Sequence, residues 1–192
     1  MPARLFTFVG GTTGPWRVET ITAVSGEPLP AAASLDIVSG TWPGPNMETQ
    51  WTLRGITSNE RYVTQDEKRL LVSSQPPLGR PEATRAALIP IRKTPAWWGL
   101  SQEERQEIFE EQSNHVRTGL RYLPAVARRL HHCRDLGEDE PFDFLTWFEY
   151  APADAAGFEE LVALLRQSRE WSYVEREVDI RVSRPARPAA GP

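Results

Sequence analysis

The clearest hydrophobic pattern lies in the second half of the chain, where short apolar runs alternate with polar turns. Residues 87–93 (ALIPIRK) are apolar and β-branched and predict a strand, within which Pro90 indicates a sheet edge or a bulge. Residues 125–133 and 142–150 predict two strands around a polar hairpin, and residues 171–182 predict a last strand.

Two amphipathic helices separate these strands. Ser101 and Glu104 have the spacing of a capping box, so a helix is expected to begin there and to end near Gly119, which accepts left-handed backbone angles. Residues 153–167 predict the second helix, because four apolar side chains recur at helical spacing (Phe158, Leu161, Val162 and Leu165). The resulting order of elements is the split βαβ, or ferredoxin-like, order, in which both helices pack on one face of an antiparallel sheet.

The first half of the chain is less regular, but it contains three segments with strand character (residues 4–10, 16–24 and 51–58). Residues 25–48 are rich in Pro, Gly and Ser and are expected to be loops with at most one short strand near residues 35–39. Residues 66–74 are a helix candidate. A second ferredoxin-like sheet could close against the first as an α+β barrel, which would leave a pocket between helices and sheet.

The segment 73–83 (SSQPPLGRPEA) divides the irregular half from the regular half. The predicted fold class is therefore α+β, with an N-terminal half over residues 1–82 and a C-terminal half over residues 83–182. Residues 183–192 contain Pro and small residues without an apolar period and are expected to be a disordered tail.

Composition narrows the classes of function. The 192 residues are 40% hydrophobic, and 22 basic against 26 acidic residues leave a net charge of -4, which disfavours nucleic-acid and anionic-membrane partners. No apolar run approaches the length of a membrane span and the N-terminus lacks a signal-peptide pattern, so a cytoplasmic location is expected. The single cysteine, Cys133, excludes an internal disulfide framework and a four-cysteine zinc site.

His115 is the most interesting of the three histidines. It lies seven residues after Ile108, about -20° around the predicted helix, and so shares the inward-facing stripe of that helix. An inward imidazole is either a core histidine satisfied by a hydrogen bond or a metal or cofactor ligand, and a haem iron is a natural partner for one such ring.

The run from Arg128 to Cys133 also carries candidate chemistry. On a strand, His131 and Cys133 point to one face and His132 to the other, so this run makes a poor zinc site, and nothing local marks Cys133 as a nucleophile. By the same alternation Arg128 shares its face with apolar neighbours and is predicted to be the buried arginine, whereas Arg129 faces the other way. A buried guanidinium needs an anionic partner, which is either a structural carboxylate or a bound anion.

These residues together resemble the chlorite dismutase family. The resemblance covers residues 85–181 and the segment TSNERYVT (57–64), and it includes a paired Trp, the histidine of the first predicted helix, an arginine thirteen residues later and a Glu-Trp before the last strand. The length resembles the short branch of the family, whose first half is abbreviated and whose members are dimeric. The resemblance therefore implies a dimeric α+β barrel and a homodimer.

The resemblance implies a role for each matched residue. His115 would be the proximal ligand of haem b, and Glu170 would accept a hydrogen bond from its Nδ1–H, which raises the basicity of the imidazole. Arg128 would be the distal, catalytic residue. The haem would be lined by four further residues, with the first two near its propionates (Tyr62, Lys93, Trp97 and Trp98).

The implied reaction converts chlorite to chloride and dioxygen with formation of the O–O bond. Arg128 would hold the chlorite anion, and then hypochlorite, through charge-assisted hydrogen bonds. Two alternatives remain at this point. The coproheme decarboxylase branch of the same family has Gln where Arg128 stands, so Arg128 argues against it. A non-catalytic haem-binding barrel would retain the pocket without turnover.

Overall fold

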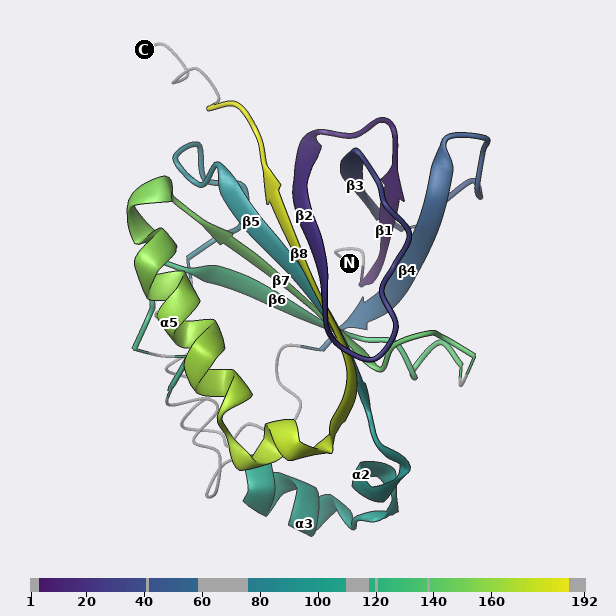
Figure 1. Cartoon of the computed structure of the whole chain (residues 1–192), viewed down its shortest axis with the longest axis vertical. Helices are drawn as coiled ribbons and strands as arrows, with labels where there is room; N and C mark the ends of the chain where they lie inside the picture. Colours follow the sequence, from purple (N-terminus) through teal and green to yellow (C-terminus); the bar gives the residue numbers. More distant parts are fainter. Residues whose placement is uncertain are drawn as a thin grey trace.

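The computed structural model describes residues 4–40, 42–58, 76–109, 118–119, 121–137 and 139–186. Within these ranges the chain forms a closed barrel of antiparallel strands in the order β1-β3-β2-β8-β5-β7-β6-β4, with one long helix on its outer surface (Figure 1). The predicted α+β barrel is confirmed.

The N-terminal half contributes four strands, and their bounds are β1 Leu5–Gly11, β2 Trp16–Ser25, β3 Ser34–Ser39 and β4 Thr49–Thr57. The C-terminal half contributes β5 Arg85–Lys93, β6 Ala127–His132, β7 Phe144–Tyr150 and β8 Val174–Ser183. Its helical elements are α2 Pro95–Gly99, α3 Gln102–Glu107, η2 Pro152–Asp154, α5 Ala155–Arg166 and η3 Arg169–Tyr173.

Both halves have the same strand order. Counted within its own half, each sheet runs fourth, first, third, second, because β4-β1-β3-β2 is followed by β8-β5-β7-β6 around the barrel. This is the order of a ferredoxin-like sheet. The described connections between β1, β2, β3 and β4 contain no helix, as expected of an abbreviated half. The boundary between residues 82 and 83 stays a prediction, and the helix candidate at residues 66–74 lies outside the described residues.

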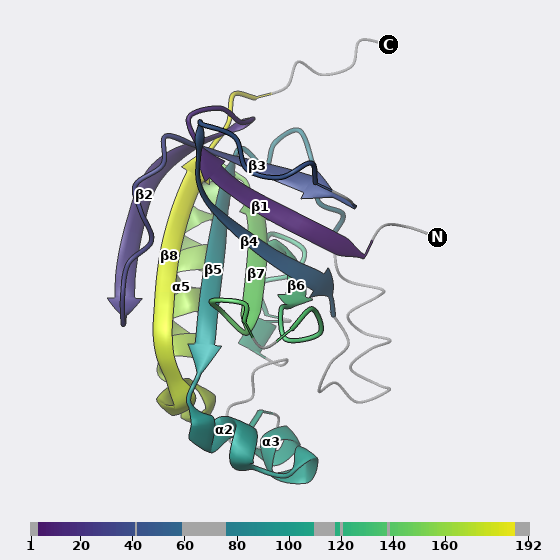
Figure 2. The same ribbon diagram turned by 90° about the vertical axis from the view of Figure 1, so that its right-hand side faces the viewer.

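Figure 2 shows α5 behind the C-terminal strands, with α2 and α3 beyond the end of β5. The helix buries four apolar side chains against the sheet (Phe158, Leu161, Val162 and Leu165), as their helical spacing predicts. The predicted capping box is also confirmed, since the Glu104 amide donates to Ser101 Oγ (3.1 Å) and the Ser101 amide donates to Glu104 Oε2 (2.7 Å). No helix in the described ranges is long and apolar enough to span a membrane. The cytoplasmic location stays a prediction.

Pro90 does not mark a sheet edge, because β5 pairs with β7 on one side and with β8 on the other. Pro90 is paired with Leu145 of β7, whereas the ladder to β8 is interrupted between Leu88 and Ile91. A proline therefore fits in a central strand where the ladder toward one neighbour already lacks a pair. A register shift toward β8 follows further along, between Arg92 and Lys93.

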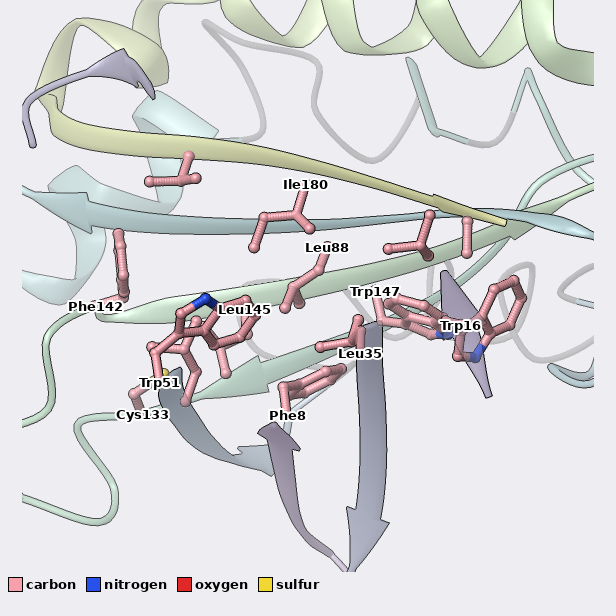
Figure 3. Close-up of a cluster of buried hydrophobic side chains, with 14 residues drawn as sticks. Phe8, Trp16, Leu35, Trp51, Leu88, Cys133, Phe142, Leu145, Trp147 and Ile180 are labelled. Carbon is pink, nitrogen blue, oxygen red and sulfur yellow. The ribbon is translucent and has the colours of Figure 1, made fainter. Parts of the chain in front are cut away.

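The C-terminal strands are buried on both faces. One face closes the barrel interior, where Trp16 and Trp147 meet edge to face with ring centroids 5.2 Å apart (Figure 3). The other face packs on α5, where Tyr150 stacks on Phe158 at 4.4 Å. Side chains that alternate along these strands thus enter two separate cores.

The sequence predicted a disordered tail from residue 183, but residues 183 and 184 contact the barrel. Ser183 belongs to β8, and the Arg184 amide donates to Thr84 O (3.0 Å) while its guanidinium lies over Trp16 at 4.3 Å. Residues 187–192 lie outside the described residues.

His131 generates a prediction about pH. It is buried in the barrel interior, its Nδ1 lies 3.1 Å from Leu145 O, and burial lowers its pKa to about 4. The unfolded chain, with a histidine pKa of about 6.5, binds the proton first as pH falls. Folding stability is therefore lost from about pH 6.5 down to about pH 4, by roughly 3 kcal/mol in total. We expect His131→Leu to be less sensitive to pH across this window, which urea unfolding at pH 4.5 to 7.5 measures. Equal slopes in the two proteins would contradict the prediction.

Candidate functional site

A cavity lies between α5 and the sheet and is partly open to solvent. Its wall is mainly aliphatic and aromatic, including Ile89, Ile91, Val126, Phe148, Leu161 and Leu165. Among the described lining residues, only Arg128 and Thr146 bring polar side chains. The pocket predicted between helices and sheet is present.

Arg128 is positioned by β6, where it pairs with Phe148 of β7 and faces α5. The strand alternation predicted this direction correctly. Burial lowers the pKa of the Arg128 guanidinium from its ordinary value, yet an arginine stays charged at any ordinary pH. The cavity therefore contains a fixed cation in apolar surroundings, which is suited to binding a small anion.

The prediction that only the Arg128 face of β6 is buried is wrong. Arg129 shares its face with His131 and Cys133, and this face closes the barrel interior, where the Arg129 guanidinium lies 4.5 Å from the Phe6 ring. Both faces are covered because the sheet closes on itself. No cluster of metal-ligating side chains occurs in the described part of the chain. Burial raises the pKa of the Cys133 thiol, which makes it a poor nucleophile.

Lys93 and Glu170 form a buried ion pair. Lys93 Nζ lies 2.7 Å from Glu170 Oε1 and also donates to Glu170 O at 3.3 Å, with both side chains at most 5% exposed. The resemblance placed Lys93 near the propionates and Glu170 beside the iron ligand. In the structure the ammonium is engaged by Glu170, because two buried charges require each other as partners. Lys93 is thus a partner of Glu170, and its place near the propionates stays a prediction.

Trp97 and Trp98 flank this ion pair in different environments. Trp97 is buried, and Lys93 Nζ lies 4.6 Å from the centre of its ring. Trp98 is partly buried, donates from Nε1 to Asp143 Oδ2 (3.2 Å) and stacks on Phe144. Neither indole is part of the cavity wall described above, so their predicted role in lining the haem stays a prediction.

Trp171 was not predicted, and it connects the ion pair to the cavity. It lines the cavity, and Lys93 Nζ lies 5.6 Å from its ring centre. Its Nε1 donates to Glu177 Oε2 (2.8 Å), and Glu177 in turn pairs with Arg166 of α5 at 2.6 Å. The sequence analysis assigned Trp171 to a strand over residues 171–182 and so did not identify this role. In the structure, residues up to Tyr173 form η3, and β8 begins at Val174. The sequence feature that could have identified Trp171 as a site residue is its position directly after Glu170.

His115 and Tyr62 lie outside the described residues, so their predicted roles as iron ligand and haem contact stay predictions. Gly119, four residues after His115 in the sequence, does line the cavity.

The sequence and the fold are matched by known proteins. The sequence pattern of the chlorite dismutase family matches residues 34–185, which is most of the chain, and the chain belongs to this family. A dimeric chlorite dismutase from Nitrobacter winogradskyi is 55% identical with a TM-score of 0.84, over 94% of this chain and 99% of that one.

Two further relatives extend the comparison. The chlorite dismutase of Ideonella dechloratans is 32% identical over 126 residues, which are 64% of this chain and 41% of that protein. This chain therefore matches less than half the length of the Ideonella protein. A chlorite dismutase from Candidatus Nitrospira defluvii in complex with imidazole is 19% identical with a TM-score of 0.65, over 96% and 92% of the two chains, a likeness that shows the common fold.

The Lys93–Glu170 pair generates a prediction about stability. Lys93→Met leaves a buried carboxylate without its cation, so we expect a loss of about 3–5 kcal/mol in the free energy of unfolding. Lys93→Met combined with Glu170→Gln should recover most of that loss, because no uncompensated charge remains. Urea unfolding measures both. Arg92→Ala is the control, since its 3.3 Å pair with Glu175 is exposed and should contribute less than about 1 kcal/mol. A double variant as unstable as Lys93→Met would contradict the account.

Proposed function

We propose that this chain is a haem b-dependent chlorite dismutase, which converts chlorite to chloride and dioxygen. The single observation that carries the proposal is Arg128, a partly buried cation in the wall of an apolar cavity between α5 and the sheet. Family membership and the 55% identity to the Nitrobacter enzyme support it.

The residues present fit a haem. The cavity wall offers aliphatic and aromatic surface to a flat apolar macrocycle, and Gly119 leaves space in the wall close to His115 in sequence. His115 would hold the iron, with the Glu170 carboxylate accepting from its Nδ1–H and Lys93 fixing that carboxylate. Bound there, the haem iron would supply the redox centre for oxygen transfer and O–O bond formation.

Arg128 supplies the anion site of the proposed reaction. Its planar fork binds the chlorite oxygens through charge-assisted hydrogen bonds and orients the anion in the cavity. β6 places the guanidinium in the cavity wall before the substrate binds, so little reorganisation is needed when the charge of the substrate is redistributed. With haem bound as the acceptor of one chlorite oxygen, the same cation would retain the hypochlorite that remains in the cavity until dioxygen forms. The reaction needs no general base, so the proposal does not require a histidine among the described residues of the cavity wall.

One prediction of this proposed function concerns Arg128. We expect Arg128→Ala to keep its haem, because the proposed iron ligand is a different residue. The variant should release dioxygen more slowly and lose activity sooner, since escaping hypochlorite destroys haem. An oxygen electrode measures both effects, and added methionine, a hypochlorite scavenger, should slow the inactivation. Arg128→Lys should be intermediate because it keeps the charge but not the planar fork.

Two outcomes would count against this role. If the unmodified, haem-loaded protein releases no dioxygen from chlorite, the chain is a non-catalytic haem-binding barrel. If Arg128→Ala prevents haem loading or folding, Arg128 is a structural ion-pair member.

Another prediction of this proposed function concerns His115. We expect His115→Ala to lose the five-coordinate haem spectrum and to bind haem far more weakly, because imidazole is the strong axial donor available there. Titration of the protein with haem, followed at the Soret band, measures this. His132→Ala is a control, since this buried histidine faces Phe144 and Asp135. An unchanged spectrum in His115→Ala would remove the assignment.

We also propose that the protein is a homodimer with no nucleic-acid or membrane partner. The Nitrobacter relative is named as dimeric, and this chain covers 99% of it. The outer face of the N-terminal strands is not covered by a helix of the described residues, which leaves surface for a two-fold partner. Sedimentation at micromolar concentration should give a dimer, and a monomer or a pentamer would contradict the proposal.

A further inference from the structure

Asp143 is a buried carboxylate that holds three parts of the site together. It immediately precedes β7, and its side chain is 6% exposed. Its Oδ2 accepts from the Lys93 amide (2.7 Å) and from Trp98 Nε1 (3.2 Å), while Oδ1 lies 3.7 Å from Arg134 Nη1. One carboxylate thus contacts the end of β5, α2 and the β6–β7 hairpin.

The position of Asp143 follows from the way β5 ends. The last pair of β5 with β7 joins Ile91 and Phe144, and the Asp143 amide then donates to Ile91 O at 2.9 Å. Beyond this point β7 offers no further strand pair to the Lys93 amide. The Asp143 carboxylate accepts a hydrogen bond from that amide instead. This is also the point, between Arg92 and Lys93, at which the register toward β8 shifts by one residue. The Lys93 backbone is therefore held on one side by its pair with Val174 of β8 and on the other side by the Asp143 carboxylate.

The other contacts of Asp143 fix the neighbouring indole. Trp98 donates to the carboxylate at its ring nitrogen, stacks on Phe144 with planes 12° apart, and carries the Arg134 guanidinium 4.3 Å from its ring centre. A neutral amide in place of the carboxylate would accept from these donors without charge assistance, and its NH₂ group would have to face one of them.

We propose that Asp143 is a positioning residue that directs the Lys93 ammonium onto Glu170. Its effect on a bound haem passes through Lys93 and Glu170, and that part rests on the proposed function. Asp143 was not singled out from the sequence, where it is one acidic residue among several beside the hairpin.

The chain contains a matched control for this proposal. Glu149, near the other end of β7, is also a buried carboxylate that accepts from one backbone amide, Gly79 N (2.6 Å), and from one indole, Trp147 Nε1 (2.9 Å). An arginine, Arg184, lies 3.8 Å away. Glu149 has the same kinds of partner as Asp143, with Arg129 as a further nearby cation, but it faces the barrel interior and does not contact Lys93. Asp143→Asn and Glu149→Gln therefore remove equivalent charges, and only the first affects the ion pair.

The first experiment measures the exposure of Lys93 and does not depend on haem. The full chain contains only two lysines, Lys68 and Lys93, so an amine-reactive reagent followed by mass spectrometry reports Lys93 directly, with Lys68 as the internal reference. We expect Asp143→Asn to raise the labelling rate of Lys93 roughly tenfold or more, the effect of weakening a hydrogen bond to a charged group. Glu149→Gln should leave it unchanged.

Trp98→Phe is the second variant, because it removes one donor and keeps both the carboxylate and its bond to the Lys93 amide. Its Lys93 labelling should stay near that of the unmodified protein. The proposal is overturned if Trp98→Phe matches Asp143→Asn, if Glu149→Gln does so, or if Asp143→Asn alone fails to fold, since Asp143 would then act on the whole fold.

The second experiment measures the ferric/ferrous midpoint potential of the haem-loaded proteins. A Glu170 released from Lys93 is a stronger acceptor for the iron ligand and stabilises ferric iron, so the potential of Asp143→Asn should fall while that of Glu149→Gln stays unchanged. Raised labelling without a fall in potential would overturn the effect on haem and leave the positioning of Lys93 standing. If the unmodified protein binds no haem, the proposed function fails, and the labelling result still decides the role of Asp143.

Discussion

The strands β5 to β8 are covered on both faces, by the barrel interior on one side and by α5 on the other, and the rest of the structure depends on this constraint. Charged side chains near the ends of these strands reach solvent, as the exposed Arg92–Glu175 pair shows. Each buried charge on these strands must instead find a partner within the fold or a bound ligand. Arg128 is the charge that this constraint places in the wall of the cavity.

The charged partners follow from that requirement. Lys93 at the end of β5 is neutralised by Glu170 of η3, and Asp143 before β7 accepts from the Lys93 amide. On β8, Glu177 is held by Arg166 and in turn orients the Trp171 indole at the cavity. The Lys93 contacts join segments 77 and 50 residues apart in the sequence, so the site and the barrel are stabilised by the same contacts.

A second network fastens α5 to the outer face of β8. Arg166 and Arg181 both pair with Asp179, and Arg181 also reaches Glu159 of α5 at 2.5 Å. Burial alone would raise the pKa of Asp179, but the hydrogen bonds from Arg181 and Arg166 hold it below its ordinary value. The stability that this carboxylate contributes is present above its unfolded pKa and is lost as pH falls through the lower folded pKa. Because α5 forms one wall of the cavity, this network also keeps the cavity in shape.

Local sequence determined much of the fold and part of the site. Apolar spacing located α5 and its buried face, the Ser101 and Glu104 spacing located the start of α3, and period-2 alternation placed Arg128 on the face toward the cavity. Alternation says which side chains share a face, but it does not say what covers that face. Closure of the barrel decided that the face of His131 is also buried, and that a proline fits in a central strand. It also brought together Lys93 with Glu170, 77 residues apart, and with Asp143, 50 residues apart. Such pairs leave no local pattern, because the desolvation that makes them necessary exists only after the sheet has closed.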